Sequence, residues 1–337
     1  MTTTLAITIV LGAGIGFLIF FLVKKVIIPQ RAATAATLED RKKINQTIRN
    51  AKAAIDKDPQ NAEAHYLLGK AFLADKREEQ AFREYRSASR LGIEGKNIPE
   101  IEFRETIASL YAKFNEEEEA LKEYVFLIKK HPGNPEYYFR SGLLFSSRGR
   151  ADRAEQYLAK AVSLNPKEER YRVELGTVYY QTKKVKEASS EFEAALRINP
   201  QGGRALLYLG KAHKDTKDFS GALPYLEKAS REQEYKLRAL VELGSCYMSL
   251  RMIDKAIMEL ERAVNCIEKE SEPDSLYARY FLAMCFEKIK DFPKAIVQWE
   301  KIYGQKKNFR DVGEKLTQYI EYRLPNEASP EGRNRKT

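Results

Sequence analysis

The sequence has few of the residues that bind metals or form disulfides. It contains three cysteines and three histidines among 337 residues. Three cysteines cannot all pair within one chain, and secreted or periplasmic domains more often carry an even number. The histidines, at positions 65, 131 and 213, are scattered, whereas a metal site needs ligands that converge. We therefore expect no bound metal and no disulfide framework.

The arrangements that perform catalysis are also missing. No Ser-His-Asp, Cys-His or paired-carboxylate pattern stands out from a heavily charged background. Gly12, Gly14 and Gly16 do not have the spacing of a nucleotide-binding glycine loop, and no alternation of strands and helices follows them. We expect a protein that is not an enzyme, has no catalytic residue and uses no cofactor.

The sequence is instead dominated by a repeat of 34 residues. Gly142, Gly176, Gly210 and Gly244 are separated by this interval, and alanines recur at the same interval in two further series. A period of this size predicts a stack of small helical units rather than a single globular core. Cys246 and Cys285 occupy the same position in successive repeats, which favours a role as small core residues.

One unit is clearest at residues 169–202, where the order Leu-Gly, Tyr, Ala, Phe, Ala, Pro resembles the tetratricopeptide repeat, a helix–turn–helix of 34 residues. Gly176 and Ala188 would let the two helices approach closely, and Phe192 would fill the groove between them. Seven units with this pattern begin near residues 62, 101, 135, 169, 203, 237 and 276. The two longer intervals predict insertions at about residues 92–100 and 268–275, read as longer turns.

The resemblance implies an all-α fold, a right-handed α-solenoid of about seven helix pairs over residues 61–307. An amphipathic helix within residues 38–60 and another within residues 308–323 are expected to cap the two ends, because terminal repeats need a polar outer face. Residues 324–337 are polar and are expected to form a disordered tail.

The amino-terminal segment has a different character, since residues 2–23 carry no charge. As a helix they would extend about 33 Å, enough to cross a bilayer core of about 30 Å. The absence of a basic residue before the apolar run argues against a cleaved signal peptide. We therefore expect a transmembrane anchor at residues 1–25 and a juxtamembrane linker at residues 26–37. Gly12 and Gly16 form a G-x-x-x-G pair, which allows two such helices to pack as a homodimer but also arises by chance.

The distribution of charge predicts the orientation of this single-pass protein. Lys24, Lys25 and Arg31 follow the apolar run, so the positive-inside rule places the amino terminus outside and the repeats in the cytoplasm. The alternative is a periplasmic array. The formal net charge is +10, but the basic residues are interleaved with acidic ones, which argues against nucleic acid. Attraction to an anionic membrane lipid surface or to an acidic partner explains the charge more simply.

In the tetratricopeptide family, the first helices line a groove that binds an extended peptide or a partner helix. Carried over by position, the groove would present Tyr66, Lys70, Phe139, Arg140, Tyr180, Arg204, Tyr208, Lys211, Lys214, Arg238, Tyr277 and Tyr280. Aromatic and arginine side chains often dominate binding energy. The stretch from Arg204 to Arg238 is basic and favours a partner with an acidic peptide or helix, although several glutamates interrupt the groove.

These features resemble the layout of bacterial membrane-anchored tetratricopeptide-repeat proteins. They favour a scaffold or adaptor that binds a protein partner through its groove, to assemble or regulate a membrane-associated complex. Two other functions stay open. One is an extracytoplasmic scaffold of an envelope machine, such as a secretion, pilus or flagellar assembly, and the other is an import receptor on an organelle membrane.

Overall fold

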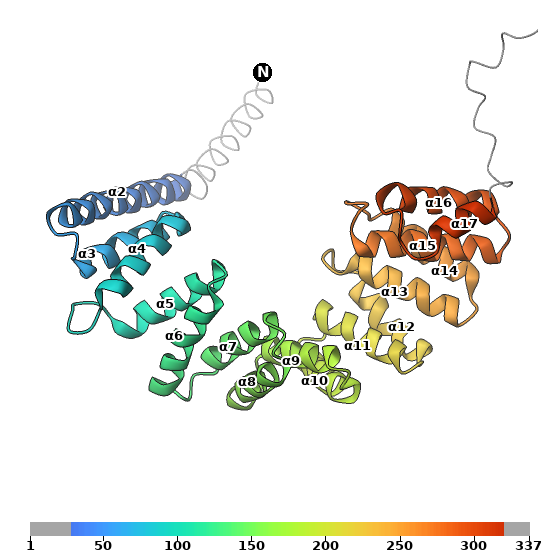
Figure 1. Ribbon diagram of the computed structural model, residues 1–337, viewed down its shortest axis with the longest axis horizontal. Coiled ribbons are helices and arrows are strands. Elements are labelled where there is room, and N and C mark those ends of the chain that lie inside the picture. The colour runs from blue at the N-terminus through green and yellow to red at the C-terminus, as the bar shows by residue number, and fades with distance from the viewer. Residues whose placement is uncertain (1–27, 320–337) are drawn as a thin grey trace, which may run out of the picture. The chain divides into compact units, whose positions relative to one another are not determined.

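The computed structural model describes the backbone of residues 28–319, with side chains from residue 39 onward. Within that range the chain forms sixteen helices and no strand, which confirms the expected all-α repeat array (Figure 1). The predicted anchor, the Gly12–Gly16 pair and the polar tail at residues 324–337 lie outside the described residues. No helix between residues 28 and 319 is both long enough and apolar enough to span a bilayer.

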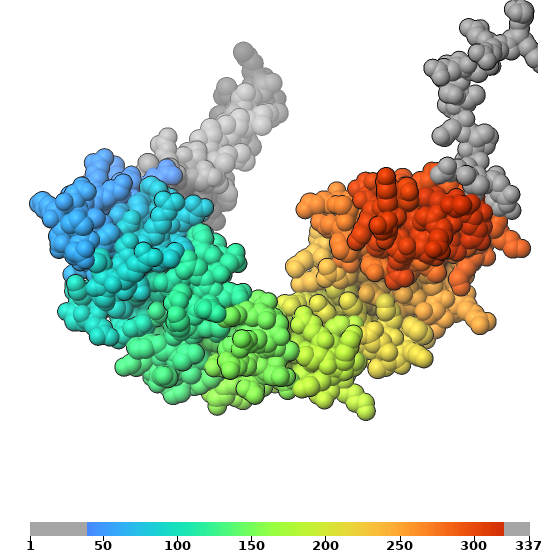
Figure 2. Space-filling view, viewed as in Figure 1, coloured from blue at the N-terminus to red at the C-terminus, as the bar shows by residue number. Residues whose placement is uncertain are grey.

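The chain divides into two compact units, at residues 1–132 and 133–337. The described part of unit 1 contains α2 (Ile28–Lys57), α3 (Ala62–Ala74), α4 (Glu78–Leu91), α5 (Glu100–Lys113) and α6 (Glu117–Lys130). Unit 2 contains α7 (Pro135–Ser147), α8 (Ala151–Leu164), α9 (Glu169–Gln181), α10 (Val185–Ile198), α11 (Gly203–Asp215), α12 (Phe219–Ala229), α13 (Lys236–Ser249), α14 (Ile253–Val264), α15 (Pro273–Lys288), α16 (Phe292–Gln305) and α17 (Val312–Gln318). Figure 2 shows that the surfaces of successive repeats within unit 2 form a continuous stack.

The helices alternate as first and second members of seven pairs. The first helices are α3, α5, α7, α9, α11, α13 and α15, and each begins within three residues of the start that the repeat spacing predicts. The largest difference is at α15, where the predicted insertion extends to residue 275 but the helix already begins at Pro273. Proline suits the first turn of a helix because its backbone nitrogen has no hydrogen to leave unpaired there.

Small residues hold the two helices of each pair together. A Cβ atom added to Gly176 in α9 would lie 2.8 Å from Cε1 of Phe192 in α10, a distance that real contacts do not reach. Ala188 and Ala195 on α10 are fully buried, as is Phe192. The spacing therefore predicts the packing correctly: the glycine lets the second helix approach, and the large ring fills the remaining space.

The turn inside each pair contains one residue with a positive φ angle. These residues are Lys76, Asn115, Gly149, Lys183, Lys217, Arg251 and Lys290, and they recur with the repeat period. This left-handed conformation is the one that glycine adopts without steric cost. Only one of the seven is glycine; five are lysine or arginine and one is asparagine. The repeat pattern alone did not indicate that these residues have a left-handed backbone.

The two terminal helices differ from their predicted bounds. α2 begins at Ile28 rather than at residue 38, so most of the expected linker at residues 26–37 is helical. Ile48 and Ala51 of α2 pack against Phe72 of α3, which joins the helix to the first repeat. At the other end α17 begins at Val312 rather than at residue 308, because Phe309 is buried in the preceding turn.

Candidate functional site

The first helices of unit 2 lie side by side and point the same way. Near the amino ends of α7 and α9, the Tyr171 hydroxyl donates a hydrogen bond of 2.9 Å to Glu136. Near the carboxyl ends of α9 and α11, the Tyr180 hydroxyl donates one of 2.6 Å to Asp215. We call the surface formed by α7, α9, α11, α13 and α15 the first-helix face. It corresponds to the groove that the resemblance implied.

Ion pairs link neighbouring first helices across this face. Arg204 of α11 pairs with Glu174 of α9, and Arg238 of α13 pairs with Asp274 of α15 at 2.8 Å. Lys214 of α11 pairs with a glutamate of α13, as described below. Because each pair joins two repeats, the charged side chains of the face are held in place before any partner binds.

The six cations predicted to line the groove are therefore all paired with carboxylates. The two outside the central stretch are Lys70, which lies 2.7 Å from Glu102 in unit 1, and Arg140, which lies 2.7 Å from Glu136 in unit 2. The hydrogen bond from Lys70 lowers the pKa of Glu102. The stretch from Arg204 to Arg238 is thus not an uncompensated basic track. Sequence spacing did not reveal this because the partners come from neighbouring repeats.

Three of the predicted groove aromatics belong to the core instead. Tyr66, Phe139 and Tyr280 are only 3%, 4% and 6% exposed. All three stand at the fifth position of their repeat. Tyr66 and Phe139 contact a ring of the following first helix, and Tyr280 contacts Phe309 in the segment before α17. The ring of Phe139, for example, lies 4.7 Å from that of Tyr171 on α9. These residues stabilise the contact between repeats and offer little surface to a partner.

The accessible centre of the face is a group of half-buried side chains on α9 and α11. The rings of Tyr180 and Tyr208 meet edge to face at 5.4 Å, and the Lys211 ammonium lies 5.7 Å and 5.5 Å from their centroids. Burial, and the hydrogen bond to Asp215, raise the pKa of Tyr180, so its hydroxyl remains a donor at neutral pH. We call Tyr180, Tyr208, Lys211, Lys214 and Glu242 the Tyr180 cluster.

Lys211 and Lys214 outnumber Glu242 in the Tyr180 cluster, and the neighbouring Asp215 carboxylate is bonded to the Tyr180 hydroxyl. Lys214 pairs closely with Glu242, and Lys211 lies 3.8 Å from the same carboxylate. The three side chains are 23%, 25% and 14% exposed in the order Lys214, Lys211, Glu242. Two ammonium groups therefore share one carboxylate, which leaves a place where a second carboxylate would bind favourably. The remaining aromatic candidate, Tyr277, is half-buried beside Arg310, whose guanidinium lies 5.2 Å from its ring.

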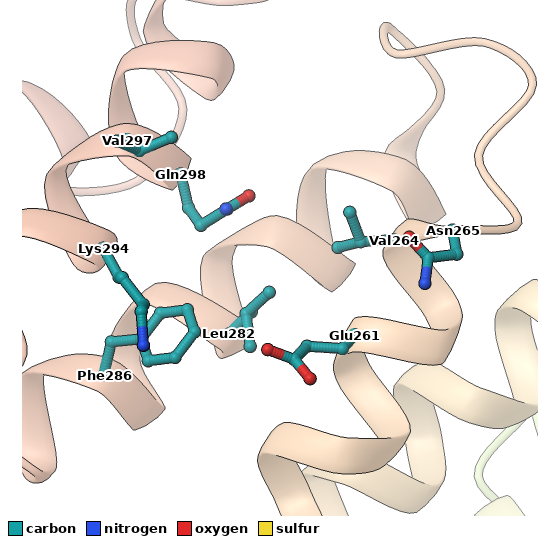
Figure 3. Close-up of a pocket in the computed structure, with 8 residues that line it drawn as sticks. All are labelled: Glu261, Val264, Asn265, Leu282, Phe286, Lys294, Val297 and Gln298. Atoms are coloured by element: carbon teal, nitrogen blue, oxygen red, sulfur yellow. The ribbon is translucent and has the colours of Figure 1, made fainter.

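A separate pocket of about 410 Å³ opens between the second helices α14 and α16 and the first helix α15 (Figure 3). Its lining comes from α14, α15 and α16 and from the residue after α14: Glu261, Val264, Asn265, Leu282, Phe286, Lys294, Val297 and Gln298. In Figure 3 the Glu261 carboxylate points toward Leu282 and Phe286. The pocket could accept an apolar side chain, and its two charged lining residues are Glu261 and Lys294.

Two of the three histidines and two of the three cysteines have structural roles. His65 lies 2.6 Å from Glu84, and His213 lies 2.8 Å from Asp218. Cys246 and Cys285 are fully buried, as their repeat positions predict, and burial raises their thiol pKa values to about 11 and about 12. Among residues 39–319 no group of His, Cys, Asp or Glu side chains is arranged to hold a metal ion.

The comparisons with known proteins agree with this architecture. Sequence profiles described as tetratricopeptide repeat match residues 40–93 and 106–169, residues 146–212 and residues 237–266, together more than half of the chain. No curated protein matches the chain.

Several solved structures share the fold at low sequence identity. A tetratricopeptide repeat protein from Parabacteroides merdae is 15% identical, with 77% of this chain and 99% of that chain covered and a TM-score of 0.55. PilF of Pseudomonas aeruginosa is 21% identical, with coverages of 66% and 97% and a TM-score of 0.52. The APC/C hetero-tetramer Cut9–Hcn1 is 15% identical, with 82% of this chain covered but only 52% of that chain, and a TM-score of 0.56. Such identities show a common fold and nothing about partners.

Proposed function

The chain is built of tetratricopeptide repeats, and on that basis we propose that it is an adaptor that holds a protein partner on the first-helix face of unit 2. Proteins made of these repeats generally mediate protein–protein interaction. The observation that carries the proposal is the Tyr180 cluster, in which rings and charges are fixed by neighbouring repeats but stay accessible.

The chemistry of the cluster restricts the kind of partner. Arg204 and Arg238 are already paired, so a uniformly acidic segment would compete with carboxylates of the protein itself. Lys211 and Lys214 share one carboxylate, so one acidic side chain of a partner peptide or helix fits beside them. The accessible parts of the half-buried Tyr180 and Tyr208 rings would contact an adjacent apolar or aromatic group. We infer a segment of mixed character with one acidic anchor.

We propose further that the adaptor works at a membrane, with the repeats in the cytoplasm. The apolar residues 2–23 and the basic residues Lys24, Lys25 and Arg31 in the sequence support this orientation. A reporter fused after Thr337 tests it, since activity only in a cytoplasmic reporter is expected. Activity only in a periplasmic reporter would instead favour a scaffold of an envelope assembly.

The binding surface is tested by photo-crosslinking in the full-length protein. A photoreactive phenylalanine at Tyr208 is expected to form a specific adduct with the partner. The same group at Tyr225, which is half-buried on the second helix α12, serves as the control. Changing Lys214→Gln should weaken adduct formation roughly tenfold or more, because a hydrogen bond to a charged group contributes about 1.5–3 kcal/mol.

Two outcomes would contradict binding on the first-helix face. One is an adduct at Tyr225 with none at Tyr208, which would move the contact to the second helices. The other is an adduct at Tyr208 whose yield does not change with Lys214→Gln. That result would show that the partner places no acidic side chain beside Lys214. Circular dichroism of the Lys214→Gln variant checks that the fold is retained.

A further inference from the structure

The turns inside the helix pairs of unit 2 share an unusual combination of conformation and charge. Their positive-φ residues are Gly149, Lys183, Lys217, Arg251 and Lys290. A side chain with a Cβ is disfavoured in this conformation, whereas glycine adopts it freely. Four of the five positions nevertheless carry a cation. A residue held in a disfavoured backbone conformation points to a role for its side chain.

These turns lie along one edge of unit 2. The first helices pack side by side and in the same direction, as the Tyr180–Asp215 hydrogen bond between the carboxyl ends of α9 and α11 shows. The turns that follow those ends are therefore neighbours. We call the exposed cations of these turns the basic edge. It consists of Arg150, Lys183, Lys184, Lys217, Arg251, Lys288 and Lys290.

Most cations of the basic edge form no ion pair with a described residue, in contrast to those of the first-helix face. Within the described range, no ion pair involves any of the four left-handed cations, at positions 183, 217, 251 and 290. Lys184 does pair with Glu155 of α8. Exposed acids also stand in the first turns of α8, α10 and α14, namely Asp152, Glu187 and Asp254. Asp218 and Asp291 accept hydrogen bonds from backbone N–H groups at the starts of α12 and α16. Unit 1 has two equivalent turns: the one between α3 and α4 carries the left-handed Lys76, and the one between α5 and α6 carries Asn115 followed by glutamate at positions 116–119.

Exposed apolar side chains lie between these cations. Met252 follows Arg251 and is 45% exposed, and Ile289 lies between Lys288 and Lys290 and is 48% exposed. A surface that binds single-stranded nucleic acid usually presents exposed aromatic rings among its cations. The rings nearest these turns, Phe219 and Phe292 at the starts of α12 and α16, are partly buried. Cations interspersed with exposed aliphatic side chains instead match the boundary of a lipid bilayer, where headgroups are charged and the layer beneath is apolar.

We propose that the basic edge of unit 2 is a membrane-contact surface that binds acidic phospholipid headgroups. Each turn supplies one or two cations to the headgroup phosphates, and Met252 and Ile289 reach the boundary with the acyl chains. The surface is distinct from the first-helix face, so that face stays available to a protein partner. The proposal does not depend on the identity of that partner or on whether residues 2–23 cross the bilayer.

Lysine footprinting of the full-length protein tests this directly. The protein is mixed with phosphatidylcholine vesicles, or with vesicles in which a third of the lipid is phosphatidylglycerol, and acetylation of each lysine is followed by mass spectrometry. Labelling of Lys183, Lys217 and Lys290 should slow several-fold on the acidic vesicles only. High salt should reverse this protection, because it screens exposed charges. Lys167 and Lys307 lie in exposed segments after second helices, at the opposite edge, and should label equally in all samples.

Matched variants complete the test. Replacing Lys183, Lys217 and Lys290 by glutamine should abolish the protection of Lys184 and Lys288, since each basic residue near an anionic surface strengthens binding about fivefold. Glutamine keeps a Cβ at the left-handed positions, so the substitution does not remove the steric cost of the positive φ angle. Replacing Lys167, Lys306 and Lys307 by glutamine should change nothing. Equal protection at both edges, equal protection on neutral vesicles, or no protection on acidic vesicles would overturn the proposal.

Discussion

Arg279 in α15 is a buried arginine whose charge is neutralised by Glu270, a residue of the segment before the helix. The arginine is only 4% exposed and donates two hydrogen bonds to the Glu270 carboxylate, one of them 2.7 Å long. Its third contact is a hydrogen bond of 2.8 Å to Gln298 of α16. The insertion that lengthens this repeat is therefore not a free loop, because Glu270 ties it to the last helix pair.

Changing Glu270→Gln should destabilise unit 2 by about 1–3 kcal/mol, since a buried guanidinium loses its charged partner. The neighbouring change Glu268→Gln is a matched control, because this exposed glutamate makes no ion pair with a described residue. Urea unfolding followed by circular dichroism measures both variants. Equal midpoints for the two would show that Arg279 does not depend on Glu270.

The same pair predicts a dependence of stability on pH. The hydrogen bonds from Arg279 lower the pKa of Glu270 from its usual value of 4.5. A lowered folded-state pKa stabilises the fold above the unfolded-state value, and that contribution is lost as the pH falls through the folded-state pKa. The difference in melting temperature between the wild type and Glu270→Gln should thus be constant near neutrality and shrink below about pH 4.5. A difference that grew with acid would contradict this assignment.

Gly176→Ala should destabilise the protein by about 1–3 kcal/mol, because the new methyl group would overlap the buried ring of Phe192. Gly304→Ala in α16 is the control, since a Cβ there meets no atom within 4 Å. That second change should be neutral or stabilise by up to about 1 kcal/mol through the higher helix propensity of alanine. Chemical denaturation of both variants distinguishes the steric overlap at Phe192 from the effect of alanine on helix propensity.

Lys183→Gly should stabilise the protein by about 0.5–1 kcal/mol. The residue has a φ angle of 64°, where glycine avoids a steric cost of about 1–2 kcal/mol but adds entropy to the unfolded chain. Lys186→Gly, three residues later within α10, should instead cost about 1 kcal/mol. If both substitutions destabilised equally, the turn conformation would not limit stability.

A thiol-specific reagent should modify Cys266 and spare the other two cysteines in the folded protein. Cys266 is partly exposed beside a pocket of about 290 Å³, whereas Cys246 and Cys285 are fully buried and burial raises their pKa values to about 11 and about 12. At neutral pH the buried groups are therefore protonated and inaccessible. Cys266→Ser should leave no reactive thiol until denaturant is added, which mass spectrometry can follow.

The repeat spacing was sufficient to place the helix pairs, because each small residue is required where two helices cross. It did not reveal the contacts that join one residue of a first helix to the residue nineteen positions later on the second. Arg172 pairs in this way with Glu191 at 2.8 Å, and Arg104 with Glu123 at 2.7 Å. The interval recurs in several repeats, so a search for oppositely charged residues at that spacing would have found it.

The exposure of the candidate site residues was harder to predict than the positions of the helices. Tyr180 and Tyr208 lie half-buried on the first helices α9 and α11, but Tyr66, Phe139 and Tyr280, which were predicted for the same groove, are in the core. Periodicity identifies which helix carries a residue, whereas exposure depends on how closely the next repeat packs. The positive charge shows the same effect. On the first-helix face carboxylates from adjacent repeats pair with Arg204, Lys214 and Arg238, whereas among the cations of the basic edge only Lys184 forms an ion pair with a described residue, through Glu155 of α8.

The sequence by itself determined the all-α class, the number of pairs and the approximate start of each first helix. These follow from local spacing, since the close crossing of two helices requires a small residue at a fixed position in every repeat. Only the tertiary structure decided which side chains stay accessible and which cations stay unpaired. Those properties depend on contacts between repeats some thirty residues apart, such as Lys214 with Glu242, and no pattern within one repeat encodes them.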